Sequence, residues 1–422
     1  MNKLNLYDVT QEAIQEGPTV SGVDAYATRG YNTTHGVYIV PAHKLEATQA
    51  QQSYIKEIGL NPNPATLIPV ETNSLTLTHA TMQQAADIRQ QIRHLGLTEL
   101  MPFMYGELAQ KVANSLDLKT PYSSVAHAHH AVERSNNKGQ ILSYFAQQGL
   151  NVPKGRRANN IQQATSIFEE LIQDGFPAAF VKITRSASGD GTVCVNNSHE
   201  LLHLFEDLRF AEALKQNEIY IDGLIPYTQS PSVLLNIGSH GYQVLGSNYQ
   251  ILKHKTASDL VPTVHMGAQG PITQAHARLM GPYIQATARF LMLNGYQGQA
   301  NVEGLLANDI NGQEQFYAIE INARQTGSSI PSLESQIIQK INKQPGTWYC
   351  NNNIKVAKGT NYQDIQTTLD EIMFNAETGY GVILSNFGII EEGKIQLTIH
   401  APNQSHLTEL ITETTHKLAN HL

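Results

Sequence analysis

The sequence predicts a mixed α/β fold, with α+β character in parts, and three observations support this prediction. Apolar segments typical of strands, at 36–40 and 65–70, are followed by a helical pattern at 82–96. Farther along, a strand at 177–184 leads into the glycine-bearing segment RSASGDG and a returning strand at 191–195. The segments QANVEGLL and FYAIEIN then form two strands joined through NDINGQ. Strands and helices therefore alternate along much of the chain.

Composition limits the size and the partners of the protein. At 422 residues the chain can bury two or three cores, because domains typically span ~100–200 residues. The net charge is −8 without an extended Lys/Arg block, which argues against nucleic acid as a partner. Cys194 and Cys350 are too few for a disulfide framework, and we find no signal peptide and no apolar run of ~20 residues. We expect a cytoplasmic protein without membrane contact, and a homodimer only as the default.

Residues 1–124 are expected to form an N-terminal α/β domain whose strands and helices carry no recognisable chemistry. A second helical stripe in this region stops at Lys119-Thr120-Pro121, which places a boundary near Ser124. Three histidines follow in VAHAHHAVER (125–134) and suggest a metal site. No cluster of cysteines or acids accompanies them, so we favour a helix start with polar histidines.

The hairpin at 177–195 has the features of a phosphate-binding loop. Glycines in its tip let backbone N–H groups approach phosphate oxygens, because glycine has no side chain and accepts unusual φ angles. Lys182, in the strand before the tip, places a positive charge suited to the α- and β-phosphates of a nucleotide. The tip does not match GxxxxGK[ST] and no helix follows it directly, which excludes a P-loop and a Rossmann fingerprint. An exposed strand lysine is the alternative interpretation of Lys182.

Two later strands present oxygen ligands for a hard cation. Side chains alternate along a strand, so Glu320, Asn322 and Arg324 share one face. The hairpin with 299–306 brings Glu303 opposite Glu320, unless a one-residue slip turns Glu303 away. Carboxylate and amide oxygens suit Mg²⁺, and a guanidinium adds a donor fork for carboxylate or phosphate. The pattern predicts a metal–nucleotide site, with the polar face of a half-buried strand as the alternative.

The order of these segments, from about Ala131 to Leu333, resembles the ATP-grasp superfamily. Asn137-Lys138 resembles the early lysine of that family, and FVKITRSASGDGTVCV resembles its second lysine and glycine-rich loop. EIYIDGLI is similar to the hinge strand, although Asp222 stands where the family often has glutamate, and NVEG and IEINAR resemble the paired metal strands. The resemblance implies ATP between two β-sheet layers and three regions: an N-terminal domain at 1–124, an ATP-grasp domain at 125–340 with a mobile lid and hinge at 177–230, and a C-terminal α+β segment at 341–422.

The same resemblance implies a role for each site residue, with ATP and Mg²⁺, or Mn²⁺, as cofactors. The implied metal ligands are Glu303, Glu320 and Asn322. The implied nucleotide-binding residues are Lys138, Lys182, Ser186, Ser188, Gly189, Gly191, Tyr220, Ile221 and Asp222. Within this set the hinge strand receives adenine through its backbone, and Asp222 holds the purine or the ribose. The implied catalytic residues are Arg324, Lys182 and Arg185.

Several cationic residues have ordinary alternatives. Lys138 is either a phosphate-binding lysine or a lysine on a helix surface. Arg185 is either a contact to substrate or phosphate or a solvated arginine. Lys154, Arg156 and Arg157 either face an anionic substrate or form a solvated turn, and we favour the solvated turn.

Four further fragments resemble the peptide-ligase branch represented in pheganomycin biosynthesis: NYQIL, HMGAQGP, EINARQTGSSIPSL and the tail at 379–411. That likeness implies ATP-dependent joining of a carboxylate to an amine, with amino acids or short peptides as substrates, through an acyl-phosphate and with release of ADP and phosphate. Two alternatives remain open: another ATP-grasp enzyme, such as a carboxylase or a phosphoryl transferase, and a regulatory module that binds ATP without catalysis. The sequence does not identify the carboxylate, the amine or the pathway.

Overall fold

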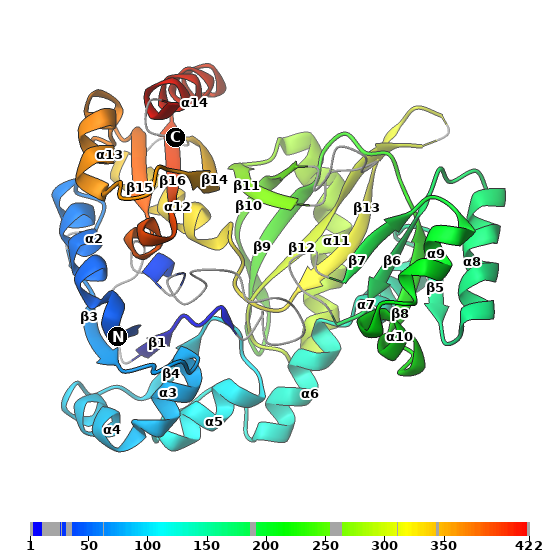
Figure 1. The fold of residues 1–422 in the computed structure, drawn as a ribbon, viewed down its shortest axis with the longest axis horizontal. Helices are drawn as coiled ribbons and strands as arrows, with labels where there is room; N and C mark the ends of the chain where they lie inside the picture. Colours follow the sequence, from blue (N-terminus) through cyan, green and yellow to red (C-terminus); the bar gives the residue numbers. More distant parts are fainter. Residues whose placement is uncertain are drawn as a thin grey trace.

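The computed structural model describes residues 3–10, 26, 28–30, 36–61, 63–185, 191–253, 264–309, 311–342 and 346–419. Over these residues the chain forms three β-sheets with helices packed on them (Figure 1). One four-stranded sheet lies in the N-terminal part, and a second lies in the middle of the chain. An eight-stranded sheet joins strands from the middle to strands from the C-terminal part. The prediction of a mixed α/β fold is confirmed.

The N-terminal sheet is parallel and has the order β3-β2-β1-β4. A parallel sheet is normally buried under helices, and here Leu4, Ile39 and Ile68 share one core with Ile88 and Val112 from the helices. Its elements are β1 (Lys3–Leu6), β2 (Val37–Pro41), η2 (Ala42–Lys44), α2 (Leu45–Glu57), β3 (Thr66–Val70), α3 (Leu77–Gln83), α4 (Ala85–His94), β4 (Glu99–Pro102) and α5 (Glu107–Ser115). A parallel sheet covered by helices is the α/β packing that the sequence predicts for the N-terminal part of the chain.

The helical pattern at 82–96 is divided between two helices in the structure. The backbone of Gln84 leaves the helical region, at φ −98° and ψ 17°, so that α3 ends before it and α4 begins after it. The side chain of Gln84 holds both backbone groups of Glu71. Its Nε2 donates to the Glu71 carbonyl at 2.7 Å, and its Oε1 accepts from the Glu71 N–H at 3.2 Å. This contact joins residues far apart in the chain, and local periodicity does not reveal it.

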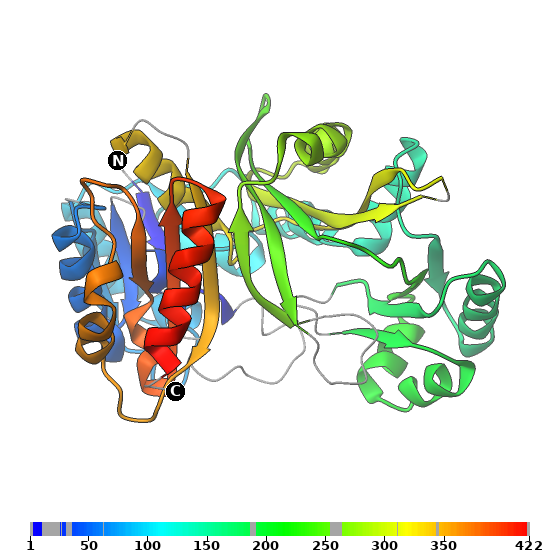
Figure 2. The same cartoon turned by 90° about the horizontal axis from the view of Figure 1, so that it is seen from above.

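The middle sheet, which we call the lid sheet, is antiparallel with the order β5-β8-β6-β7. Figure 2 shows the lid sheet and its helices as a layer apart from the eight-stranded sheet. Its core packs α8 against the strands through Ile167, Phe168 and Leu171. Its elements are β5 (Gly155–Ala158), α8 (Ile161–Gln173), β6 (Ala179–Ile183), β7 (Thr192–Val195), α9 (Ser198–Leu204), α10 (Leu208–Lys215) and β8 (Ile219–Gly223). The predicted hairpin at 177–195 is therefore part of a complete sheet.

The solvated turn that we favoured for Lys154, Arg156 and Arg157 is correct in part. Arg156 and Arg157 belong to β5 rather than to a turn, whereas Lys154 precedes that strand, and Lys154 and Arg156 are exposed. Arg156 makes two hydrogen bonds of 2.6 Å to Glu170 of α8. Arg157 Nη2 donates to Asn137 Oδ1 at 2.5 Å. These partners come from neighbouring helices, and they explain the basic cluster without an anionic substrate.

The eight-stranded sheet, which we call the large sheet, has the order β13-β12-β9-β10-β11-β14-β16-β15. One of its faces packs on α7 and α11, where Phe145, Tyr283 and Phe316 meet edge to face. The strands are β9 (Pro231–Ile237), β10 (Tyr242–Lys253), β11 (Val264–Gly270), β12 (Gly298–Asn308), β13 (Glu314–Asn322), β14 (Thr347–Lys355), β15 (Gly381–Ser385) and β16 (Lys394–Ala401). The remaining helices are α6 (Val125–Ser135), α7 (Lys138–Gln147), α11 (Gln274–Leu293), α12 (Ser329–Asn342), α13 (Tyr362–Leu369), η3 (Asp370–Ile372), η4 (Phe387–Glu392) and α14 (Gln404–Leu418).

The C-terminal part contributes β14, β16 and β15 to the large sheet, and it also packs against the N-terminal part (Figure 1). Tyr54 and Ile55 of α2 belong to the same core as Ile383 and Leu397. The Tyr54 hydroxyl accepts a hydrogen bond from the Leu384 N–H at 3.1 Å. The division that we place at 340 falls inside α12, whereas the division at 124 falls at the N-cap of α6. The three-region scheme stays a proposal.

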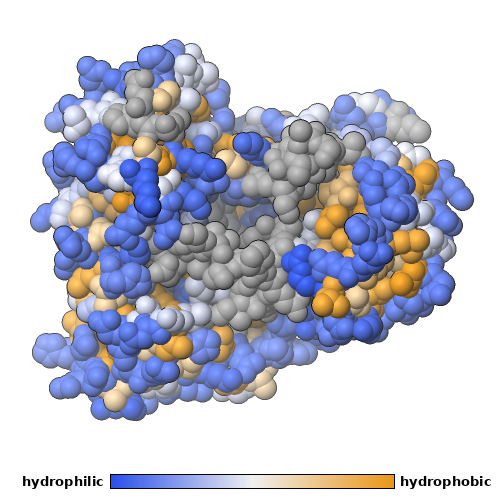
Figure 3. All heavy atoms as spheres, in the orientation of Figure 1, coloured by the Kyte–Doolittle hydropathy of each residue, from blue (hydrophilic) through white to orange (hydrophobic). Residues whose placement is uncertain are grey.

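None of the described helices combines the length and the apolar character that a membrane crossing requires. Figure 3 shows apolar side chains among the exposed residues of the lid side of the molecule. Leu202 on α9 and Leu208 on α10 are 46% and 78% exposed. Single exposed leucines are common on protein surfaces, so these residues do not define a partner.

Gly304 lies opposite a β-bulge of β13, where Ile319 is the extra residue between the partners of Glu303 and Gly304. A Cβ atom at this position would meet the carbonyl of Tyr317 and the ring of Phe316. We therefore expect Gly304→Ala to lower the free energy of unfolding by about 1–3 kcal/mol, because the backbone of β13 must move to admit the methyl group. Urea denaturation of the two proteins measures this difference.

Gly281 in α11 provides the matched control for that substitution. Outside its chain neighbours and its own helix backbone, a Cβ atom at Gly281 would meet no atom within 4 Å. Alanine favours helices more than glycine does, whereas the following Pro282 disfavours a side chain at this position. Gly281→Ala should therefore change the free energy of unfolding by less than about 1 kcal/mol. An equal loss in both variants would contradict the role assigned to the bulge.

Candidate functional site

Strands β12 and β13 pair in the register that the sequence predicts. Glu303 lies opposite Glu320, and Asn301 lies opposite Asn322. Residues directly opposite one another in an antiparallel pair project from the same face of the sheet. Two carboxylates and two amides therefore gather on one face of the large sheet, and both asparagines are buried there.

Glu303 is surrounded by side-chain amides. Asn301 Nδ2 donates to its Oε1 at 2.6 Å, and Asn322 Nδ2 donates to the same oxygen at 3.2 Å. Gln250 Nε2 donates to its Oε2 at 2.9 Å. Burial raises the pKa of Glu303 to about 7, and the charge of Glu320 adds to this rise, although the amides oppose it. A carboxyl group with this pKa can exchange its proton for a cation near neutral pH.

Asn322 has an oxygen that suits a cation. Its amide nitrogen binds Glu303, whereas its Oδ1 is buried and has no hydrogen-bond partner among the described residues. A buried acceptor without a donor, next to two carboxylates, is the oxygen that a hard cation would use. Glu320 retains 23% exposure of its side chain, which leaves it accessible. These three residues fit Mg²⁺ by the chemistry of their oxygens.

Lys138 lies beside this group of oxygens. It is the first residue of α7, after the N-cap Asn137, and its Nζ lies 3.5 Å from Glu320 Oε1. Burial lowers the pKa of Lys138, and the charge of Glu320 opposes this shift. The positive charges of Arg324 and Lys182 lower the pKa of Lys138 further. Helix α7, the lid strand β6 and the end of β13 therefore bring their cations into one region.

Lys182 and Asp222 form a buried ion pair within the lid sheet. Lys182 Nζ lies 2.6 Å from Asp222 Oδ2, and the two side chains are 9% and 0% exposed. Burial raises the pKa of Asp222, and Lys182 opposes the rise. Only Oδ2 of Asp222 binds Lys182, and its Oδ1 is buried without a hydrogen-bond partner among the described residues, so the contact to purine or ribose expected of it stays a prediction. Lys182 has three N–H donors, of which Asp222 takes one, so donors remain for a phosphate.

The backbone contact to adenine expected of Tyr220 and Ile221 does not fit β8. This strand lies between β5 and β6, so both residues have a ladder partner on each side. Their backbone groups face those neighbouring strands, and the Tyr220 hydroxyl donates to the Gly155 carbonyl at 3.1 Å. The connection at 224–227 follows β8, lies outside the named strands and joins the lid sheet to the large sheet.

Arg324 and Arg185 have different surroundings. Arg324 follows the end of β13, is 8% exposed, and opposes the rise in the pKa of Glu303 by its charge. Arg185 is half exposed, with Nη1 3.0 Å from Glu133 and Nε 2.9 Å from Glu218. The sequence left open whether Arg185 is a solvated arginine or a contact to phosphate or substrate. In the structure, two acids bind its guanidinium.

Three residues expected in the phosphate loop, Ser186, Ser188 and Gly189, lie outside the described residues. Gly191 is described, and its φ of +73° lies in the left-handed region that glycine favours. Its carbonyl accepts a hydrogen bond from the Ile183 N–H at 2.8 Å. The two strands of the hairpin therefore meet at Gly191.

Asn301 and Gln250 belong to the site, although the sequence did not indicate them. Asn301 binds Glu303, donates to Ser232 Oγ at 3.1 Å, and accepts from the Asn322 N–H at 3.2 Å. The same two-residue alternation that identified Asn322 identifies Asn301 within NVE. Gln250 lies on β10, and only the order of strands in the large sheet brings it to Glu303.

The three histidines of VAHAHHAVER lie on α6, which begins at Val125 with Ser124 as its N-cap. The helix start that we favoured is confirmed. Within the described part of the chain, no group of three or more His, Cys, Asp and Glu side chains is placed to hold a metal ion. The cation site outlined above differs because an amide oxygen supplies its third ligand.

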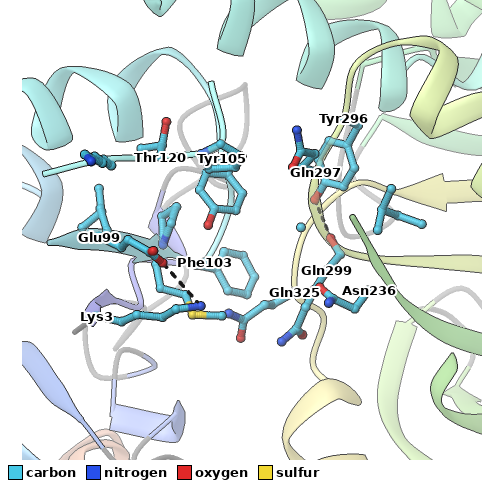
Figure 4. A pocket seen from close by; sticks show the side chains of 17 residues that line it. Lys3, Glu99, Phe103, Tyr105, Thr120, Asn236, Tyr296, Gln297, Gln299 and Gln325 are labelled. Carbon is cyan, nitrogen blue, oxygen red and sulfur yellow. Dashed lines mark hydrogen bonds and ion pairs between the residues drawn. The ribbon is translucent and has the colours of Figure 1, made fainter. Parts of the chain in front are cut away.

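A cavity of about 410 Å³ lies between the N-terminal sheet and one end of the large sheet (Figure 4). Tyr105 lines one side, Gln299 lines the other, and the Lys3–Glu99 ion pair of 3.6 Å lies at its edge. Gln299 precedes Glu303 by four residues, roughly 13 Å along the strand. The cavity is therefore apart from the paired carboxylates.

Solved structures share this fold over nearly the whole chain. A biotin carboxylase from Campylobacter jejuni covers 100% of this chain and 91% of its own, with a TM-score of 0.59 and 14% identity. An N5-carboxyaminoimidazole ribonucleotide synthetase from Thermus thermophilus covers 99% and 98%, with a TM-score of 0.56 and 13% identity. An L-amino acid ligase from Bacillus licheniformis covers 99% and 98%, with a TM-score of 0.54 and 13% identity. The chain therefore has the fold of these proteins, which is the fold that the resemblance to the ATP-grasp superfamily predicted.

One curated relative matches part of the chain. It is the [butirosin acyl-carrier protein]–L-glutamate ligase of Niallia circulans, which is 24% identical over 195 residues. The match spans 45% of this chain and 43% of that relative, so the chain matches less than half of the relative's length. No family model matches the chain.

The raised pKa of Glu303 predicts a dependence of stability on pH. The unfolded chain keeps the ordinary carboxyl pKa of 4.5, so the folded chain binds this proton more tightly. The contribution of Glu303 to stability should therefore be lost as pH rises from 4.5 through about 7, because the folded state must then hold an ionised, partly buried carboxylate next to Glu320. In metal-free buffer the melting temperature of Glu303→Gln should vary less than that of wild type between about pH 5 and about pH 8. Parallel profiles would contradict this assignment.

The buried Lys182–Asp222 pair predicts a large effect on stability. Asp222→Ala leaves an ammonium buried without its carboxylate, so the free energy of unfolding should fall by about 3–5 kcal/mol in urea denaturation. Lys154 and Asp174 are the matched control, because their charged atoms also lie 2.6 Å apart but their side chains are 59% and 40% exposed. Asp174→Ala should cost about 0–1 kcal/mol. Similar losses of unfolding free energy in Asp222→Ala and Asp174→Ala would show that burial does not determine how much the Lys182–Asp222 pair contributes to stability.

Proposed function

We propose that the chain is an ATP- and Mg²⁺-dependent ligase that joins a carboxylate to an amine and releases ADP and phosphate. The observation that supports this proposal is the gathering of Glu303, Glu320 and Asn322 on one sheet face, with Lys138 beside them and Arg324 at the strand end. Oxygen ligands next to fixed cations suit a metal-bound polyphosphate, because the cation and the side chains together offset its charge.

The similar proteins support this class of reaction. The relative from Niallia circulans is a ligase named for an acyl-carrier protein and L-glutamate, and the protein from Bacillus licheniformis is an L-amino acid ligase. A related biotin carboxylase domain from Hydrogenobacter thermophilus was solved with the magnesium salt of ADP. From these names we infer ATP and Mg²⁺, with Mn²⁺ as a substitute, and amino acids or short peptides as substrates. The likeness of the sequence to the pheganomycin-type branch favours peptide ligation.

Glu303, Glu320 and Asn322 would hold the metal ion. When bound, the ion would neutralise phosphate charge and orient the phosphate oxygens. Glu303 loses its proton to serve as a ligand, and Asn301 and Gln250 keep its carboxylate in place. The unpartnered Oδ1 of Asn322 is already turned away from Glu303.

In the proposed reaction, a carboxylate oxygen of one substrate attacks the γ-phosphorus of ATP, and the bond to the β–γ bridging oxygen breaks. ADP leaves and an acyl-phosphate remains. The nitrogen of the amine then attacks the acyl carbon, phosphate leaves with the electrons of the C–O bond, and the nitrogen loses a proton. No protein nucleophile is required, and Lys138, Lys182 and Arg324 offset the repulsion between the two anions.

The remaining site residues have supporting roles in this proposal. Asp222 positions Lys182 through Oδ2 and keeps its proposed contact to the purine or ribose through Oδ1, and the connection at 224–227 replaces Tyr220 and Ile221 as the segment nearest adenine. Ser186, Ser188, Gly189 and Gly191 keep their proposed contacts to phosphate. A contact of Arg185 with phosphate requires that Glu133 and Glu218 release it. We assign the lid sheet the task of keeping water from the acyl-phosphate.

Cellular location is also a proposal. Cys194 and Cys350 are both free thiols. An ATP-consuming ligase with free thiols suits a reducing compartment supplied with ATP, and we propose the cytoplasm.

A carboxylase is the second candidate, because a biotin carboxylase shares the fold over the whole chain with a TM-score of 0.59. Turnover that depends on bicarbonate and biotin, without an amine, would favour it. An ATP-binding regulatory module would bind nucleotide without turnover on any substrate.

Glu320→Gln tests the proposed ligase. We expect wild type with Mg²⁺-ATP to release ADP and phosphate when given pools of amino acids, dipeptides and small carboxylates, and to form a condensed product detected by mass. Glu320→Gln removes one charged metal ligand and should reduce this release by about 10²–10³-fold. Turnover by wild type that persists in Glu320→Gln would exclude this residue from the chemistry.

Glu314→Gln is the matched control on the same strand. Glu314 lies at the opposite end of β13 and pairs with His276 at 2.9 Å. Its substitution should leave ADP release unchanged. Equal losses in both variants would indicate damage to β13 rather than loss of a ligand.

A further inference from the structure

Arg29 lies in the short described segment 28–30 of the N-terminal part, outside the site described above. Its guanidinium carbon lies 4.0 Å from the centre of the Tyr26 ring, so the ring covers one face of the guanidinium. Its Nε donates a hydrogen bond to Gln396 Oε1 at 3.0 Å. The side chain is therefore held at one face and at one edge.

Gln396 is fixed by a buried polar network. It is 2% exposed, its Oε1 also accepts from Asn386 Nδ2 at 3.2 Å, and its Nε2 donates to the Asn352 carbonyl at 3.1 Å. Asn386 is fully buried and accepts a hydrogen bond from the Thr28 hydroxyl. The network ties the segment of Arg29 to β16 and keeps the guanidinium in one orientation.

The terminal nitrogens of Arg29 have no hydrogen-bond partner in the part of the chain that the structure describes. A guanidinium has five N–H donors, and the bond to Gln396 uses the one on Nε. Among the described residues, no carboxylate forms an ion pair with Arg29 and no acceptor binds its Nη1 or Nη2. A positioned guanidinium without an acid suits an anion that arrives from outside the chain.

These donors face the loop that follows Arg324. Arg29 Nη1 lies 3.7 Å from the position that a Cβ atom of Gly327 would occupy, and Asn352 Nδ2 lies 3.6 Å from the same position. Gly327 comes three residues after Arg324, and as a glycine it leaves this space open. Two N–H donors from distant parts of the chain therefore converge beside the loop of the proposed catalytic arginine.

Strand pairing relates this place to the metal strands. Burial raises the pKa of the Cys350 thiol and the charge of Arg29 opposes this rise, so Arg29 lies near that thiol. Cys350 pairs with Ala268, and Ala268 pairs with Gln250, whose side chain binds Glu303. Partners in a ladder project from one face, so Cys350 and Gln250 share the face of the site. Two strand spacings, roughly 10 Å, separate them.

We propose that Arg29 and Asn352 bind a carboxylate that does not react and that belongs to one of the two substrates. This inference rests on the proposed ligase function, in which Arg324 and Lys138 act on the reacting end. Arg29 Nη1 and Nη2 would each donate to one carboxylate oxygen, and Asn352 Nδ2 would add a third hydrogen bond. The substrate class is then an amino acid as the amine, or a dicarboxylic acid as the acyl donor.

The test compares wild type, Arg29→Met, Arg29→Lys and the control Arg278→Met, all as the full chain with Mg²⁺-ATP. Arg278 is an exposed arginine on α11, so its substitution removes the same charge elsewhere. In one arm the amines are L-amino acids and their C-terminal amides. In the other arm the acyl donors are L-glutamate and L-glutamine, or glutarate and butyrate. ADP release gives KM and kcat for each pair.

We expect Arg29→Met to raise KM for the carboxylate-bearing member of one pair by roughly ten- to a hundredfold, with little change in kcat, and to abolish its preference over the neutral member. Arg29→Lys keeps the positive charge but lacks the planar pair of donors, so its KM should lie between those of wild type and Arg29→Met. A loss in the amine arm assigns the carboxylate to the amine, and a loss in the donor arm assigns it to the acyl donor. Unchanged preferences in both arms would overturn the proposal.

A binding measurement separates this proposal from the ligase proposal. The melting temperature of each protein with Mg²⁺-ADP is recorded with the same amino acids, dicarboxylates and neutral analogues. If no pool supports turnover, the ligase proposal fails, yet protection by the carboxylate members that is lost in Arg29→Met still supports the anion site. Equal protection of wild type and Arg29→Met, or no protection of wild type, overturns it.

Discussion

The pairing of β12 with β13 is the constraint on which the site depends. Its register puts Glu303 and Glu320 next to each other on one sheet face, where the two negative charges repel and Glu303 is poorly solvated. The amides of Asn301 and Gln250 reduce this cost in part, and a proton on Glu303 reduces it further. A divalent cation would remove the conflict more completely, because it supplies positive charge at the point where the oxygens gather.

Charge balance explains Lys138 and Lys182, the two buried lysines of the site, in different ways. Lys182 has a dedicated partner in Asp222 on the adjacent strand of the same sheet, so its position is set within the lid. Lys138 lies on a helix of the neighbouring layer, 3.5 Å from Glu320, and feels the other cations as well. Its backbone N–H also donates to the Thr184 carbonyl at the end of β6, at 3.1 Å. The start of α7 therefore connects the lid sheet to the metal strands, and a movement of the lid would be felt at both lysines.

The first and last parts of the chain complete the structure together. Helix α2 shares its core with β15 and β16, and the Gln396 network joins the segment of Arg29 to β16. Because β14 pairs with β11 in the large sheet, this joint core is continuous with the sheet that carries Glu303. The region that we propose for substrate recognition is thus built from residues more than 300 positions apart, held by ordinary sheet pairing and by buried amides.

The sequence by itself determined the elements whose signal is local. Alternation along one strand placed Glu320 and Asn322 on a common face, because it depends only on neighbouring residues. The short hairpin determined that the two strands pair, whereas the bulge of β13 beside Glu303 and Gly304 shifts the register by one residue and brings Glu303 opposite Glu320. The tertiary structure decided what depends on strand order and distant partners: Asp222 faces Lys182, Tyr220 lies on an inner strand, and Gln84 divides a helix by binding Glu71. Local periodicity contains no information about which strand becomes the neighbour of another, so these contacts follow only from the folded arrangement of the sheets.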